Sequence, residues 1–188
     1  MRLHLAVMDE TKEIKEDFEK ELIELEEMID GYLEFARNDR EEQMVDASLF
    51  KLLQQAAKTS DPTGEKITIS VPADNIPIFP MQVQSIRRAL INLFTNAIRY
   101  AGKANAQIQI FDDHSEIIID DNGPGIPRDK RDEVVLPFTR LENSRNFKTG
   151  GTGLGLSIAK NSALNHGGEL ILEDSPLGGL RVRLLLPL

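Results

Sequence analysis

The sequence predicts an α+β domain with helices on one face of a mixed, mostly antiparallel sheet, preceded by a long amphipathic helix. Strand patterns occur in adjacent pairs, at 106–121 and again at 169–186, which implies antiparallel hairpins. Helix patterns separate these pairs, and the acidic N-terminal segment carries a heptad stripe of apolar residues.

The N-terminal segment, residues 1–40, is expected to be helical. Its apolar side chains recur at spacings of four and three, at Phe18, Leu22, Leu25, Ile29, Tyr32 and Ala36. A single helix cannot bury such a stripe by itself. We therefore expect the stripe to pack on the domain that follows or on another chain.

Residues 46–188 carry the pattern of the α+β domain. The expected elements, in chain order, are a helix at 46–57 capped by Asp46 or Ser48, a strand at 66–71, a proline-rich connection at 72–80, a helix at 82–100, hairpin strands at 106–111 and 116–121, a helical turn from Pro127, a helix at 155–166, and closing strands at 169–173 and 180–186.

Composition excludes several classes of function. The chain has 188 residues, of which 40% are hydrophobic, and a net charge of -9, so general binding to nucleic acid or to an anionic membrane is not expected. It has no cysteine, which excludes disulfides, thiolate metal sites and a cysteine nucleophile. No apolar run reaches the roughly 18 residues of a membrane span. We expect any membrane attachment to lie in parts of the protein outside this sequence.

Two glycine clusters flank a polar, charged segment. The first is DNGPG at 121–125 and the second is GGTGLG at 150–155. Neither has the lysine of a Walker P-loop or the third glycine of a Rossmann fingerprint. GLSIA at 155–159 lacks the last glycine of a nucleophile elbow, so Ser157 is interpreted as a helix residue.

A different nucleotide site fits this order of motifs. A strand delivers Asp121 to the first cluster, where a carboxylate can accept a hydrogen bond from an exocyclic amine such as that of adenine. The second cluster starts a helix at about Leu154, whose free N–H groups suit phosphate oxygens. Asn92 and Asn96 lie four apart on one helix face, and an asparagine oxygen can ligate Mg²⁺. Each motif alone is most often a turn, a loop or a solvated surface, but turns alone do not explain their joint occurrence.

With these motifs the sequence resembles the ATP-binding catalytic domain of sensor histidine kinases, of the Bergerat (GHKL) type shared with Hsp90, gyrase B and MutL. LINLFTNAIRY resembles the N box, DNGPG the first glycine box, LPFTR the F box and GGTGLGLS the second glycine box. The resemblance covers about residues 46–188 and implies a two-layer sandwich. Residues 1–40 resemble the end of a dimerisation and phosphoacceptor hairpin, most like that of osmosensor-type (EnvZ-like) kinases.

The resemblance implies ATP and Mg²⁺ as cofactors. Asn96 would ligate the metal, Asn92 would support it, and Asp121 would bind the adenine amine. A lid over about Thr139–Gly150 would close on the nucleotide from a hinge at Phe138. The other implied contacts to the nucleotide are Arg99, Tyr100, Gly123, Gly125, Ile126, Arg140, Arg145, Lys148, Gly151, Thr152, Gly153, Leu154, Gly155 and Leu156.

No phosphoacceptor is assigned on this chain. The family phosphorylates a histidine followed by an acidic residue, a basic residue, threonine and proline, and His4, His114 and His166 all lack this context. We therefore expect the sequence to begin after that motif, and the chain alone to bind ATP without phosphorylating itself.

For the full protein, the resemblance implies a homodimer formed by the hairpin, relay of the phosphoryl group to a response-regulator aspartate, and a cytoplasmic position below a bacterial inner-membrane sensor. Two alternatives stay open. One is an ATP-binding regulatory module without kinase chemistry, and the other is a serine-directed kinase of the anti-sigma type.

Overall fold

The computed structural model describes residues 42–70, 77–141 and 152–188, together with positions 15, 18, 19, 22, 25, 26, 29, 32 and 33 of the N-terminal segment. Its elements are β1 (Val45–Ser48), α2 (Leu49–Ser60), β2 (Ile67–Ser70), β3 (Ile78–Met81), α3 (Val83–Ala101), β4 (Ala104–Ile110), β5 (His114–Asp121), the 3-10 turn η2 (Arg128–Lys130), α4 (Arg131–Val134), α5 (Gly155–Asn165), β6 (Glu169–Asp174) and β7 (Leu180–Pro187).

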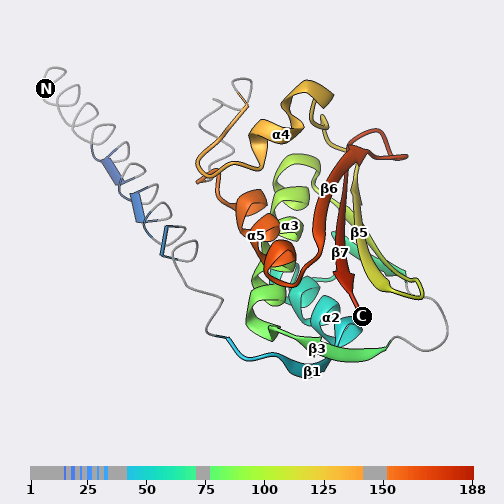
Figure 1. Ribbon diagram of the computed structural model, residues 1–188. Coiled ribbons are helices and arrows are strands. Elements are labelled where there is room, and N and C mark those ends of the chain that lie inside the picture. The colour runs from blue at the N-terminus through green and yellow to red at the C-terminus, as the bar shows by residue number, and fades with distance from the viewer. Residues whose placement is uncertain are drawn as a thin grey trace, which may run out of the picture.

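A layer of helices covers one face of the main sheet (Figure 1). The strand order is β2-β4-β5-β7-β6, with β2 parallel to β4 and the remaining neighbours antiparallel. Helix α3 lies between α2 and α5 and contacts both. The predicted α+β class, with a mixed and mostly antiparallel sheet packed on helices, is confirmed.

The core lies between these two layers. Alternation along β5 and β7 places Ile117 opposite Leu184 and Ile119 opposite Val182, and all four side chains are buried. The amphipathic helix α3 buries the opposing apolar stripe, which includes the fully buried Phe94. Burial of this stripe fixes the rotation of α3 about its axis, and so fixes which of its residues face away from the core.

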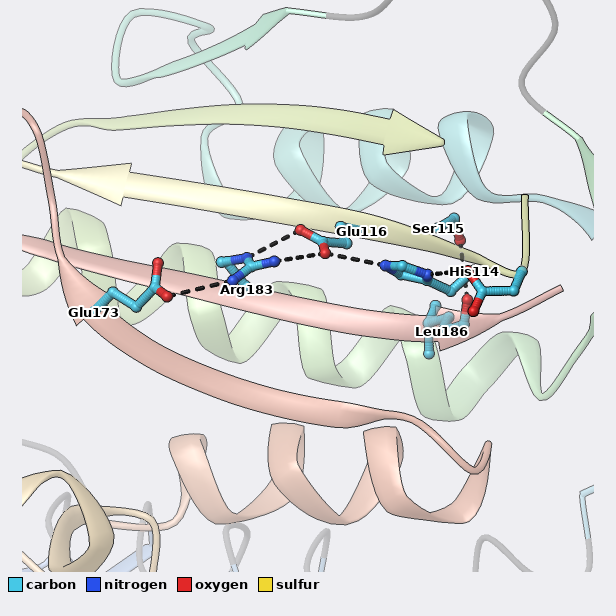
Figure 2. Close-up of polar contacts among 7 residues, drawn as sticks. His114, Ser115, Glu116, Glu173, Arg183 and Leu186 are labelled. Carbon is cyan, nitrogen blue, oxygen red and sulfur yellow. Dashed lines mark hydrogen bonds and ion pairs between the residues drawn. The ribbon is translucent and has the colours of Figure 1, made fainter. Parts of the chain in front are cut away.

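The opposite face of the sheet carries a network of charged groups (Figure 2). Arg183 on β7 donates to Glu116 on β5 through Nε (3.0 Å) and Nη2 (2.6 Å), and to Glu173 on β6 through Nη1 (3.3 Å). Glu116 also contacts Nε2 of His114 (3.1 Å), whose Nδ1 contacts Asp113 (2.6 Å). Hydrogen bonds to Asp113 and then to Glu116 raise the pKa of His114 above its ordinary value of 6.5.

Ser48 is the residue that caps α2. Its hydroxyl accepts a hydrogen bond from the N–H of Lys51 (3.4 Å), whereas Asp46, the other candidate, lies within β1. The predicted connection at 72–80 is wrong at its end, because Ile78–Met81 forms β3 and pairs with β1, a strand that was not predicted. Each strand has only four residues, and the paired residues lie 30 to 36 positions apart, so neither strand shows a clear alternation in the sequence.

The N-terminus of α3 is capped by Glu42, a residue that precedes β1 in the chain. The carboxylate of Glu42 accepts from the N–H groups of Gln84 (2.7 Å) and Ser85 (3.0 Å), which belong to the first turn of α3. Gln82, the residue before the helix, donates its backbone N–H to Nε2 of His166 (2.9 Å). His166 therefore carries its proton on Nδ1, which donates to the carbonyl of Ser162 (2.7 Å). These bonds join the entering chain, α3 and the end of α5.

The described positions of the N-terminal segment are helical. The predicted stripe residues Phe18, Leu22, Leu25, Ile29 and Tyr32 are between 46% and 60% exposed, so the described part of the chain does not bury them. Ala36, the last stripe residue, lies outside the described residues. No described helix combines the length and apolar character that a membrane crossing requires.

Candidate nucleotide-binding site

The two asparagines of α3 meet the second glycine cluster. A Cβ atom added to Gly155 would lie 3.0 Å from Nδ2 of Asn96 and 3.2 Å from Oδ1 of Asn92. Asn92 donates its Nδ2 to the carbonyl of Arg88 (3.0 Å), so its amide oxygen remains on the side of Gly155. The structure therefore brings together the N box and the first turn of α5, as the motif order predicts.

The first turn of α5 presents backbone donors to this region. No side chain of the described residues caps its N-terminus, which leaves the early N–H groups of the helix for another acceptor. Glycine at position 155 lets the first turn of α5 lie directly against the asparagine amides, where a Cβ atom would be crowded. Amide oxygens on one side and backbone N–H groups on the other fit a Mg²⁺-bound phosphate chain.

Asp121 ends β5 as a buried and oriented carboxylate. Its Oδ1 accepts hydrogen bonds from the backbone N–H groups of Gly123 and Leu180, both at 2.9 Å. Asp121 as a whole residue is only 7% exposed. Both hydrogen bonds that it accepts from described residues go to Oδ1, and none goes to Oδ2. One oxygen thus fixes the carboxylate in place, while the other can accept a hydrogen bond from a ligand amine.

The first glycine cluster is packed closely on both sides. A Cβ atom on Gly123 would lie 3.1 Å from the carbonyl oxygen of Tyr100, in the last turn of α3. Gly125 has a φ of 68°, which favours glycine, and a Cβ atom there would lie 3.3 Å from the carbonyl of Gly179. The loop therefore runs between the end of α3 and the turn that joins β6 to β7.

Gly179 lies directly against the candidate site, and the sequence did not reveal this. A Cβ atom there would overlap Oδ1 of Asp121 and lie 2.5 Å from the backbone nitrogen of Gly123. A side chain at 179 would thus displace the carboxylate proposed to hold the base. The only signal in the sequence was the GG pair, which a turn between the closing strands explained equally well.

The F box and the second glycine cluster are joined through their backbones. The N–H of Phe138 donates to the carbonyl of Gly153 (3.0 Å), and a Cβ atom on Gly153 would lie 2.9 Å from the carbonyl carbon of Phe138. Phe138 itself has a φ of 64°, a conformation that costs a non-glycine residue roughly 1–2 kcal/mol. Phe138 directly precedes the segment for which the sequence predicts a lid.

The other predicted contacts lie around this centre or outside the described residues. Arg99 and Tyr100 are exposed in the last turn of α3, and Arg140 is exposed just after Phe138. Leu154 is fully buried and Leu156 packs against the core, so these two can offer only backbone groups to a ligand. Ile126 and Thr152 are half-buried. The predicted contacts Arg145, Lys148 and Gly151, and lid residues 142–150, lie outside the described residues.

Ser157 is a helix residue, as interpreted from the sequence. Its buried hydroxyl donates to the carbonyl of Leu154 (2.8 Å) within the first turn of α5. Of the three histidines, His114 and His166 hold the structural contacts given above, and His4 lies outside the described residues.

Comparison with known proteins identifies the family to which this arrangement belongs. A family model described as "Histidine kinase-, DNA gyrase B-, and HSP90-like ATPase" matches residues 81–188. The chain belongs to this family. The resemblance stated from its motifs is confirmed, and so is ATP as the ligand of a domain of this type.

Individual relatives extend the likeness beyond residues 81–188. The sensor histidine kinase CpxA of Escherichia coli K12 is 33% identical over 186 residues, which are 95% of this chain and 40% of CpxA. The ATP-binding domain of PrrB from Mycobacterium tuberculosis is 29% identical with a TM-score of 0.61, covering 77% of this chain and 96% of that one. The histidine kinase domain of the E. coli osmosensor EnvZ is 31% identical with a TM-score of 0.58, covering 78% and 89%. The chain thus spans about two fifths of the length of CpxA.

Proposed function

We propose that the chain is the catalytic portion of a sensor histidine kinase, which binds Mg-ATP and transfers the γ-phosphoryl group to a histidine of the dimerisation hairpin. The observation that carries this proposal is the convergence of Asn92, Asn96 and Gly155, together with the oriented carboxylate of Asp121 at the end of β5. The likeness to CpxA, a sensor histidine kinase, supports histidine as the acceptor of the phosphoryl group.

Each residue of the site has a role that follows from its contacts. Oδ2 of Asp121 accepts from the adenine amine, while Gly123, Gly125 and Gly179 let the backbone approach the base. The amide oxygen of Asn96 is the metal ligand, with Asn92 beside it. When bound, Mg²⁺ holds phosphate oxygens and neutralises their charge, which is its general contribution to phosphoryl transfer.

The cationic side chains complete the proposed phosphate region. Arg99 at the end of α3 and Arg140 after the hinge are the described candidates for phosphate contact. In this proposal the lid closes from Phe138 and Gly153, whose shared hydrogen bond fixes one wall of the site. Closure excludes water and gathers positive charge around the transferred group.

The N-terminal segment has a separate role in this proposal. Residues 1–40 form part of the dimerisation hairpin, and residues 46–188 form the ATP-binding domain. The exposed stripe that includes Leu22, Leu25 and Ile29 supports pairing with a second copy, because large apolar side chains in a helical stripe require a partner. The phosphoryl group is relayed to the aspartate of a response regulator, and the domain works on the cytoplasmic side of an inner-membrane sensor.

Incubation with γ-labelled ATP tests the chemistry. The chain would be incubated alone and with a separate protein that carries a phosphoacceptor hairpin, and Asn96→Ala would serve as the inactive control. We expect no stable label on the chain alone, and an acid-labile label on the hairpin. An acid-stable label would favour a serine kinase, and ATP binding without any transfer would favour a regulatory module.

A further inference from the structure

Arg131, the first residue of α4, lies six residues after the first glycine box and makes three different contacts. Its Nε donates to the carbonyl of Ile126 (3.1 Å), and its Nη1 donates to the carbonyl of Leu172 on β6 (3.3 Å). Its Nη2 forms an ion pair with Asp174 at the end of β6. The side chain is only 15% exposed, whereas Asp174 is 62% exposed. One planar guanidinium therefore joins the loop to the edge strand of the sheet.

This contact completes a two-point attachment of the loop at 121–127. At its start, the loop is fixed by the carboxylate of Asp121, which accepts from the backbone of Gly123 and of Leu180 on β7. At its end, it is fixed by Arg131 through the carbonyl of Ile126. Between the two points lies Gly125, whose positive φ allows a backbone path that most residues do not adopt. Without the hydrogen bond from Arg131 to the carbonyl of Ile126, the end of this loop is free to move relative to β6 and β7.

We propose that Arg131 is a positioning residue for adenine recognition. It holds the carbonyl of Ile126 against β6, and so keeps the first glycine box at the distance from which Asp121 meets the base. The inference rests on the proposed role of Asp121 and extends it to a side chain that does not touch the nucleotide. Hydrogen bonds weaken steeply when the donor and acceptor move out of range or alignment. A small shift of the Asp121 carboxylate relative to the base would therefore weaken the bond between them.

Arg128 supplies a matched control. It lies three residues earlier, on η2, and binds the same carboxylate of Asp174 through Nη2 (3.0 Å) and Nε (3.3 Å). Its side chain is 83% exposed, and its hydrogen bonds to described residues go to Asp174 rather than to the carbonyl of Ile126 or of Leu172. Replacing Arg128 removes an ion pair to the same strand but leaves the attachment of the loop intact.

The experiment compares the dissociation constants of Mg-ATP and Mg-GTP, by calorimetry, for the unaltered chain, Arg131→Lys, Arg131→Ala and Arg128→Ala. Lysine keeps the charge opposite Asp174, but a single ammonium cannot reproduce the fork that reaches two carbonyls as well. We expect both Arg131 variants to bind Mg-ATP about tenfold more weakly, with little change for Mg-GTP, which gains nothing from Asp121. We expect Arg128→Ala to keep the preference for Mg-ATP.

The ratio of the two constants separates positioning from damage to the fold. A partly unfolded variant loses affinity for both nucleotides in the same proportion, and that result would overturn the proposal. A full preference for Mg-ATP in Arg131→Lys would also overturn the proposal. This variant therefore tests the proposal even if Arg131→Ala does not fold. Failure of the unaltered chain to bind Mg-ATP at all would instead reject the proposed function, and this inference with it.

Discussion

Asp121→Asn is the change that tests the proposed recognition of adenine most sharply. The two backbone N–H groups that point at Oδ1, from Gly123 and Leu180, require an acceptor there. In the variant they hold the amide oxygen at that position, which forces the NH₂ group into the place of Oδ2. The fold keeps both hydrogen bonds, so its melting temperature should change little. The ligand, however, meets a donor where it previously met an acceptor.

The expected loss can be estimated from the bond that disappears. A hydrogen bond to a charged group contributes roughly 1.5–3 kcal/mol, which corresponds to about a 10- to 150-fold weaker affinity for Mg-ATP. Guanine carries a carbonyl where adenine carries its amine, so the new NH₂ group suits GTP and the preference for ATP should disappear or reverse. Calorimetric titration with both nucleotides measures this. Unchanged ATP affinity in Asp121→Asn, or equal binding of ATP and GTP by the unaltered chain, would refute the assignment.

Three further predictions concern the proposed metal ligand, the turn before β7 and the histidine on the outer sheet face. Asn96→Ala should weaken Mg-ATP binding while the melting temperature stays near that of the unaltered protein. If the variant loses the same ATP affinity with and without Mg²⁺, Asn96 is not a metal ligand. Gly179→Ala should lower stability by about 1–3 kcal/mol and impair ATP binding, because the added methyl group overlaps the carboxylate of Asp121; normal unfolding and normal binding would contradict this. The pKa of His114 is raised by folding, so its stabilising contribution is complete below the unfolded value of 6.5 and is lost as the pH rises through the folded value. Urea unfolding between about pH 6 and pH 9 should therefore show a steeper loss of stability for the unaltered protein than for His114→Gln, and parallel curves would show that the histidine is not coupled to folding.

The site could be predicted from the sequence where its residues lie in short motifs. Asp121 with Gly123, and Asn92 with Asn96, are separated by only a few positions, so strand and helix periodicity place them without knowledge of the fold. The elements that support them are contacts between distant segments. Leu180 donates to Asp121 across 59 residues, Arg131 reaches Asp174 across 43, and Glu42 caps α3 across 42. The neighbouring sequence gives no sign of these partners, since a leucine in a strand and an arginine or glutamate at the surface are ordinary residues.

The pairing of β1 with β3 was missed for the same reason. Each strand has four residues, and the pair lies apart from the main sheet. Pro80 favoured a connection in the sequence, yet a two-stranded ladder tolerates proline because one edge of each strand needs no partner. Phe79 and Met81 are buried in the same core as α2, so packing outweighs the local signal.

The contacts of Glu42 limit the choice of the first residue when the ATP-binding domain is expressed separately. The family match starts at residue 81, but a protein that begins there lacks α2, whose Leu49 and Leu53 are fully buried in the shared core. A start at residue 46 keeps α2, yet it leaves the amides of Gln84 and Ser85 without the carboxylate that caps them. Since α3 carries both asparagines, loss of this cap would destabilise the helix that presents the proposed metal ligand. An isolated domain intended for nucleotide titration or inhibitor screening should therefore begin before Glu42.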